Sequence, residues 1–283
     1  MYHITGRVTL LTIIFVGATS AFAQTLPTSQ PNVIQIFREE VKFGHEADHT
    51  KTEGAVVAAL EKAKFPHFVI ALASLTGQPE AWFVAPFDSH AAIGEFNKKL
   101  GEEPLANEFA RLTRADADHV SSGRVIQAVA RKDLSRGTFP DAGKQRFYEI
   151  TVFRVRPGHE GEFAAAGKAY GAAAGRNAPE TNYRVYEVTA GMPGPTYLIF
   201  SSMVKFGEVD KMMTAGEATM KGMTPEEMAA LQKFSTDALI SAETFRFRLD
   251  PEMSYVPKEV RAQDPDFWMP KKPAATKRPT SQQ

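Results

Sequence analysis

The stretch from Phe43 to Gly54 reads FGHEADHTKTEG and contains His45, Glu46 and His49 in the order H-E-x-x-H. Two histidines four residues apart share one face of a helix and can bind one Zn²⁺, while the glutamate between them serves as general base toward a zinc-bound water. The spacing therefore raises one hypothesis, a zinc metallohydrolase with His45 and His49 as metal ligands.

The composition narrows the classes of protein to consider. The chain has 283 residues, 43% of them hydrophobic and 23% charged, which is globular composition with length for one large domain or two small ones. Lys plus Arg equals Asp plus Glu at 33 each, so no net charge recruits nucleic acid. The absence of cysteine excludes disulfides, thiolate nucleophiles and covalent c-type haem attachment.

The N-terminus has the pattern of a secretory signal peptide. A basic region ends at Arg7, an apolar run covers Val8 to Ala18, and Ala21 and Ala23 flank one residue as in an A-x-A cleavage site. We expect residues 1–23 to be removed and the protein to be exported, either to the periplasm or outside the cell. No later segment is apolar for the length that a membrane span needs, so no stable membrane insertion is expected.

The rest of the chain contains an internal repeat. IQIFREEVKFGHEADH begins at Ile34 and YEITVFRVRPGHEGEF begins at Tyr148, so that G-H-E recurs with a shift of 114 residues, from position 44 to position 158. The same shift pairs Gly77 with Gly191 and Pro79 with Pro193. The chain is therefore divided into a first repeat at 24–135, a second repeat at 144–255 and a flexible, basic, Pro-rich tail at 256–283.

Each repeat is predicted to run strand, helix, strand, strand, helices, strand. Alternating β-branched and aromatic residues predict the strands, and Ala-rich stretches after a glycine predict the first helices. Thr224, Pro225 and Glu227 predict a capped helix start within a Met-rich segment that could otherwise form a flexible lid. The expected strands are 33–41, 68–75, 81–87 and 124–131, then 146–155, 183–188, 196–202 and 244–250; the expected helices are 45–64, 90–100 and 104–120, then 159–176, 205–215 and 224–242.

The order β-α-β-β-α-β is that of the ferredoxin-like unit, whose four-stranded sheet leaves one apolar face uncovered. The second repeat also carries Val155, Pro157, Gly158, Glu160 and Phe163 at its first strand-helix junction, a V-x-P-G-x-E-x-x-F pattern. With these residues the chain resembles the dimeric α+β barrel superfamily, including its NIPSNAP-like and antibiotic-biosynthesis-monooxygenase-like domains. The resemblance implies an α+β fold in which two repeats form one intramolecular barrel, a pseudo-dimer that could pair again as a homodimer.

The repeat also gives the H-E-x-x-H stretch an interpretation without metal. The second repeat has Phe163 where the first has His49, and Thr52 stands where the extended zinc motif needs glycine. Glu46 suits the positive end of a helix dipole. We therefore interpret the stretch as a helix start and predict no metal site and no cofactor, with His45 and His49 kept as the alternative metal ligands.

Aromatic residues on the predicted strands suggest a binding cavity, although plain core packing would explain them too. Half of them should face the barrel interior, where Tyr hydroxyls and an arginine would add polar contacts for an aromatic or lipid-like molecule. Five of the histidines lie in the first repeat and one in the second, which favours the first repeat as the site. The candidate ligand-binding residues are His67, Trp82, His90, Tyr148, Arg154 and Tyr186.

The function predicted from the sequence is that of an exported barrel protein that binds a small apolar or aromatic ligand. The family resemblance implies a second hypothesis, a monooxygenase-like enzyme that is either cofactor-free or bound to haem through a histidine. The zinc metallohydrolase is the third. No phosphate-binding loop and no G-x-S-x-G nucleophile motif occurs in the chain.

Overall fold

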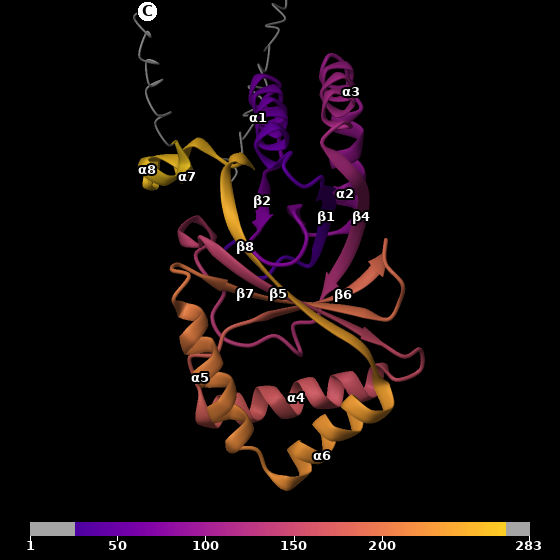
Figure 1. The fold of residues 1–283 in the computed structure, drawn as a ribbon, viewed down its shortest axis with the longest axis vertical. Coiled ribbons are helices and arrows are strands. Elements are labelled where there is room, and N and C mark those ends of the chain that lie inside the picture. Colours follow the sequence, from indigo (N-terminus) through magenta and orange to yellow (C-terminus); the bar gives the residue numbers. More distant parts are fainter. Residues whose placement is uncertain (1–25, 270–283) are drawn as a thin grey trace, which may run out of the picture.

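The protein forms an eight-stranded closed barrel with helices at both ends (Figure 1). The structure is a computed structural model that describes residues 26–269, so the predicted signal peptide and the last part of the predicted tail lie outside the described residues. The strands are β1 Val33–Val41, β2 Val69–Ser74, β3 Glu80–Phe87, β4 Val120–Ala130, β5 Phe147–Val155, β6 Arg184–Ala190, β7 Thr196–Met203 and β8 Leu239–Tyr255. The helices are α1 Glu46–Lys62, α2 His90–Leu100, α3 Leu105–Asp116, α4 Glu160–Asn177, α5 Glu208–Lys221, α6 Pro225–Lys233, α7 Lys258–Gln263 and α8 Pro265–Trp268.

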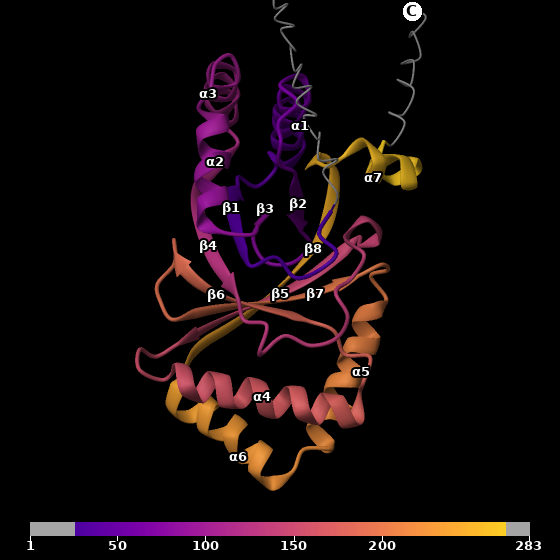
Figure 2. The ribbon, with the colours of Figure 1, turned by 180° about the vertical axis from the view of Figure 1, so that it is seen from behind.

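The strand order confirms the predicted fold. Around the barrel it is β1-β3-β2-β8-β5-β7-β6-β4, and every neighbouring pair is antiparallel. Each half supplies a ferredoxin-like sheet, β4-β1-β3-β2 or β8-β5-β7-β6, and the pairs β2–β8 and β4–β6 join the two sheets. The helices α1 to α3 lie at one end and α4 to α6 at the other, as the reverse view also shows (Figure 2).

Alternation along each strand creates two apolar layers. On β1, Ile34 and Ile36 belong to the barrel interior with Trp82, whereas Val33 and Phe37 pack against the helices of the first half. This is the period of two that a pleated strand imposes. Each half therefore has a sheet with one face toward the barrel interior and one face toward its own helices.

The register places residues of the two halves at matching positions, here called equivalent. On β1 and β5 the shift of 114 residues holds, because β1 pairs with β3 as β5 pairs with β7. The last β2–β3 pair is Ala73 with Ala81 and the last β6–β7 pair is Glu187 with Tyr197, so the second hairpin encloses two more residues and the shift becomes 116 on β7. Val41 N donates to Pro79 O and Val155 N donates to Pro195 O, which makes Pro195 the equivalent of Pro79 and corrects the sequence pairing with Pro193.

Several predicted boundaries were wrong at the edges of the barrel. The helix predicted to 120 ends at Asp116, and β4 begins at Val120 rather than 124 because Val120 still pairs with Val41. The helix predicted over 224–242 ends at Lys233, a short π-helix follows, and β8 begins at Leu239. Both strands begin before the hydrophobic alternation does, because residues such as Ser122 and Glu243 are exposed and polar while their backbones stay in the ladder.

The predicted flexible tail from residue 256 is also corrected in its first part. Residues 258–268 form α7 and α8, since Val256, Val260 and Trp268 are buried against the barrel core. The Arg146 guanidinium carbon lies 3.8 Å from the centre of the Phe267 ring and adds a cation-π contact. Among the described helices, none has the length and apolar character to cross a membrane.

The start of α6 confirms the predicted cap and gives a first test. The Thr224 side chain accepts from Glu227 N at 3.3 Å, and Glu227 Oε2 accepts from Thr224 N at 2.9 Å. We expect Thr224→Ala to lower the free energy of unfolding by about 1 kcal/mol, because the first turn of α6 loses its side-chain acceptor. Urea denaturation measures the change. Thr224→Ser retains the hydroxyl and should match the wild type, and equal losses for both variants would contradict the cap.

Candidate functional site

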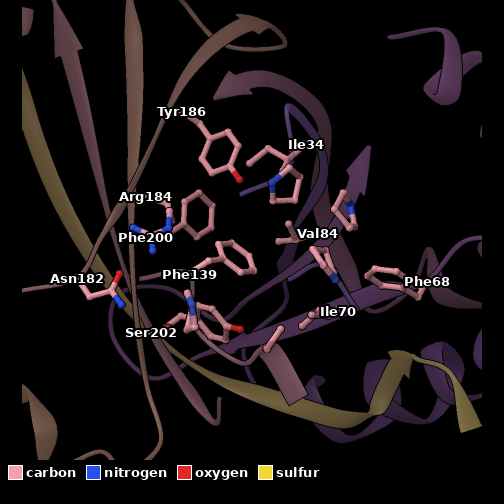
Figure 3. Close-up of a pocket in the computed structure, with 16 residues that line it drawn as sticks. Ile34, Phe68, Ile70, Val84, Phe139, Asn182, Arg184, Tyr186, Phe200 and Ser202 are labelled. Atoms are coloured by element: carbon pink, nitrogen blue, oxygen red, sulfur yellow. The ribbon is translucent and has the colours of Figure 1, made fainter. Parts of the chain in front are cut away.

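One cavity lies inside the barrel, with aromatic rings around it (Figure 3). Its volume is about 110 Å³, and its walls include Ile34, Val84, Tyr186 and Phe200. The guanidinium of Arg184 is already engaged, because it donates to backbone carbonyls of residues 136, 137 and 183. One water needs about 10–15 Å³ in the same measure, so this space holds several waters or a molecule of a few atoms.

A much larger cleft lies between the sheet of the second half and its helices. Its volume is about 1160 Å³, in the size range of sites for drug-sized ligands. The strands β5 and β7 form its floor. Residues of α4, α5 and α6, the helices at the lower end of the molecule in Figure 1, line its other side. The walls include Thr151, Ile199 and Ser201 from the sheet and Tyr170, Met212, Met213 and Phe234 from the helical side.

Side-chain size explains why this cleft is open in one half only. In the first half the equivalent of Thr151 is Phe37, whose ring centre lies 6.3 Å from that of Phe96. The equivalent of Ile199 is Phe83, which is also buried against the helical side of the sheet. Protein interiors are close-packed, so smaller side chains at the same positions leave a space unless something fills it. The second half is therefore hollow where the first half is packed with rings.

Polar and apolar side chains both line this cleft. Glu149 Oε2 accepts from Arg246 Nε at 2.9 Å, and these two residues form an ion pair on the floor. Burial raises the pKa of the Tyr170 phenol, and a hydrogen bond with Thr219 only partly offsets this effect. Met213 is 61% exposed at the rim. The cleft thus offers a mostly apolar surface together with polar side chains, a composition that suits a small molecule with both apolar and polar parts.

The structure does not bring the six predicted ligand-binding residues together. Tyr148 and Tyr186 line the small barrel cavity, and burial raises the pKa of both phenols. Trp82 is fully buried in the barrel core, where its Nε1 donates to Glu80 at 2.7 Å. The prediction of a ligand site at these residues remains untested.

The other three candidates lie outside both cavities. His67 packs against the rings of Phe65, Phe87 and Phe96, and burial lowers its pKa. His90 is the exposed first residue of α2, and Arg154 is half-buried on β5. The sequence analysis missed the residues that form the large cleft, because Thr151 and its neighbours belong to no catalytic or metal-binding motif. Only the exchange of a phenylalanine for a threonine between the repeats could have indicated them.

The two histidines of the H-E-x-x-H stretch have different partners. His45 precedes α1 and its Nδ1 lies 3.0 Å from His119 Nδ1, while Glu46 is exposed. His49 is 2% exposed and lies with Glu39, Glu53 and Asp116. One ligand atom of each of these four residues lies within 4.8 Å of the others, which makes them a group that could hold a metal ion. His45 is not part of it.

A haem held through a histidine does not fit either cavity. Among the described residues that line the barrel cavity or the cleft, none is a histidine. The half-buried His67 packs against phenylalanine rings of the first half instead.

Comparison with known proteins supports the fold. No protein-family profile matches the sequence, and no curated protein matches it. An anthrone oxidase-like protein of known structure aligns over 79% of this chain and 93% of its own, with a TM-score of 0.52 and 10% identity. A provisionally assigned monooxygenase from Fusobacterium nucleatum subsp. nucleatum aligns over 78% and 93%, with a TM-score of 0.50 and 11% identity. At these identities the likeness shows the fold alone, the dimeric α+β barrel.

Proposed function

We propose that the protein binds a small apolar or aromatic molecule in the cleft of its second half. The observation that carries this proposal is the cleft of about 1160 Å³ at positions that phenylalanines fill in the first half. Burying an apolar ligand there would remove apolar surface from water at roughly 25 cal/mol per Å². The ion pair of Glu149 with Arg246 supplies polar atoms that a ligand with one polar group can contact.

Filling the cleft tests this proposal. Thr151→Phe and Ile199→Phe each copy the equivalent first-half residue, so we expect each to weaken binding of the uncharged probe N-phenyl-1-naphthylamine by about tenfold or more, or about 1.4 kcal/mol. Fluorescence titration of the purified protein measures the affinity, and circular dichroism confirms that each variant folds.

The matched control for this experiment is Thr151→Val, which keeps the volume and removes only the hydroxyl. Its affinity for the probe should stay within about twofold of the wild type, since no space is lost. Wild-type affinity in both phenylalanine variants would place the probe elsewhere and refute the cleft as its site.

Oxidation of the bound molecule is the second candidate function. It is favoured by the descriptions of the two fold neighbours as a monooxygenase and as anthrone oxidase-like. A cofactor-free reaction would convert anthrone and O₂ into anthraquinone and water. If the protein consumes oxygen in the presence of anthrone and Thr151→Phe abolishes this uptake, the protein is an enzyme that acts in the cleft. Binding of anthrone without oxygen uptake would contradict this candidate function and support a binding protein.

We also propose that the chain arose by tandem fusion and that it is exported. The shift of 114 residues from β1 and its G-H-E helix start to β5 and the second G-H-E supports a tandem fusion of two NIPSNAP-like units into one polypeptide. The N-terminal pattern supports export after cleavage behind Ala23. Mass spectrometry of the protein collected outside the cytoplasm should then give a chain that begins at Gln24, and an intact N-terminus would contradict export by this route.

A further inference from the structure

We propose that the first half contains a binding site for a divalent transition-metal ion of the Zn²⁺ type, formed by Glu39, His49 and Glu53 and oriented by Asp116. The site is separate from the cleft in the second half, and it lies at the opposite end of the molecule from α4 to α6 (Figure 1). It uses one histidine of the H-E-x-x-H stretch in a different arrangement from that of a zinc protease.

Three elements bring the four side chains together. Glu39 lies on β1, His49 and Glu53 are one turn apart on α1, and Asp116 ends α3. The spacing of four residues puts His49 and Glu53 on one face of the helix. His49 and Asp116 are 2% and 5% exposed, and Glu39 and Glu53 are half-buried. The group therefore faces the protein interior rather than open solvent.

Asp116 determines which nitrogen of His49 is free. His49 Nδ1 lies 3.1 Å from each carboxylate oxygen of Asp116, so Nδ1 carries a proton and donates it to that carboxylate. In neutral imidazole the lone pair is then on Nε2. A carboxylate that holds the far nitrogen of a histidine is the arrangement that orients metal-ligating histidines.

The free nitrogen is buried and has no partner. His49 Nε2 makes no hydrogen bond, and it lies 3.7 Å from Glu39 Oε2, which is also buried without a hydrogen bond. A buried polar atom without a partner destabilises the fold, and the two atoms here lie too far apart for a direct hydrogen bond. An ion bound to both of them would satisfy both atoms at once.

The carboxylates of the group have neither a lysine nor an arginine as counterion in the described part of the chain. Within residues 26–269, neither a lysine nor an arginine forms an ion pair with Glu39, Glu53 or Asp116. Buried carboxylates are normally paired with a cation or coordinate a metal, because an isolated buried charge loses its hydration. A divalent cation would supply the charge that the side chains do not.

The second half shows that the fold does not require these residues. The equivalents of Glu39, His49 and Glu53 are Phe153, Phe163 and Gly167. Phe163 stacks on Tyr197 with ring centres 3.8 Å apart and contacts Phe234 edge-on. Aromatic rings fill this position in the second half. Burying four ionisable groups at the same position in the first half is unfavourable, and a bound cation would offset that cost.

The donor set selects the type of metal. One imidazole nitrogen and two carboxylates suit Zn²⁺, which binds such sites with three protein ligands and an open fourth position. Mg²⁺ and Ca²⁺ prefer oxygen ligands alone. We therefore expect Zn²⁺ to bind much more tightly than Mg²⁺ or Ca²⁺.

Isothermal titration with ZnCl₂ after EDTA treatment and buffer exchange tests the site. We expect one Zn²⁺ per chain, and we expect Glu39→Gln and Glu53→Gln each to weaken binding more than about 100-fold, since each removes a charged ligand and keeps the shape. Co²⁺ added to the same protein should give the visible absorption of a tetrahedral site, and Glu53→Gln should abolish that absorption.

His45→Gln and Glu46→Gln are the matched controls, because both residues belong to the same H-E-x-x-H stretch but lie outside the group. Each should bind Zn²⁺ like the wild type. Loss of binding in His45→Gln would assign the ion to His45 and His49 and overturn the proposal. No stoichiometric Zn²⁺, or equal affinity for Mg²⁺, would also overturn it, whatever the outcome of the ligand titrations at the cleft.

Discussion

Replacing Glu80 by alanine is expected to lower the free energy of unfolding by about 3 kcal/mol, because it leaves the largely buried Arg38 without its counterion. Glu80 is 5% exposed and accepts from Arg38 at 3.0 and 2.6 Å and from Trp82 Nε1 at 2.7 Å. The Arg38 guanidinium also lies over the rings of Trp82 and Phe245 inside the barrel. Urea denaturation followed by tryptophan fluorescence measures the loss.

The second half supplies the control for this prediction. There the equivalents of Arg38 and Glu80 are Val152 and Thr196, which fill the barrel without charge. The double variant Arg38→Val/Glu80→Thr copies that pair and leaves no unpaired ion, so it should lie within about 1–2 kcal/mol of the wild type. If the double variant is as unstable as Glu80→Ala, the unpaired charge is not the cause.

The fold was predictable because local patterns repeated. The strand alternation, the G-H-E helix starts and the Thr224 cap each agree with the same β-α-β-β-α-β order, and the structure has that order twice. The first part of the tail was not predictable, because its three buried side chains are spread over a segment of mostly polar and charged residues. Such contacts depend on tertiary packing that no local pattern encodes.

The cleft and the proposed metal site both lie where the residues of the two repeats differ. His49 was recognised as a candidate ligand, but its partners were missed because Glu39 and Asp116 are 10 and 67 residues away in the sequence. The same holds for the cleft, where a threonine replaces a phenylalanine. Position-by-position comparison of two repeats indicates where side chains differ, and only the folded barrel shows which differences meet.

Metal-free protein is expected to lose stability as the pH rises from about 5 to about 9, and Glu53→Gln is expected to remove most of that loss. Burial raises the pKa of the Glu53 carboxyl from 4.5 to about 8, and the charge of Glu39 adds to the effect. The pKa of Glu39 is raised by burial as well. Burial lowers the pKa of His49, but the neighbouring carboxylates of Asp116, Glu53 and Glu39 together outweigh burial and raise that pKa.

The sign of the effect follows from where the proton binds. Between pH 4.5 and 8 the folded Glu53 holds a proton that the unfolded chain releases, so its contribution is complete below pH 4.5 and disappears as the pH passes 8. The contribution of Glu53 to the free energy of unfolding is on the order of 3–5 kcal/mol, at about 1.4 kcal/mol per pKa unit. Glutamine stays neutral at every pH and cannot lose this contribution, so Glu53→Gln should exceed the wild type in stability at pH 9.

Urea denaturation in EDTA at pH 5, 7 and 9 measures the stability of both proteins. The variant of the exposed Glu46, Glu46→Gln, is the control and is expected to follow the wild type. Parallel pH profiles for Glu53→Gln and the wild type would show that Glu53 is ionised in the folded protein at neutral pH.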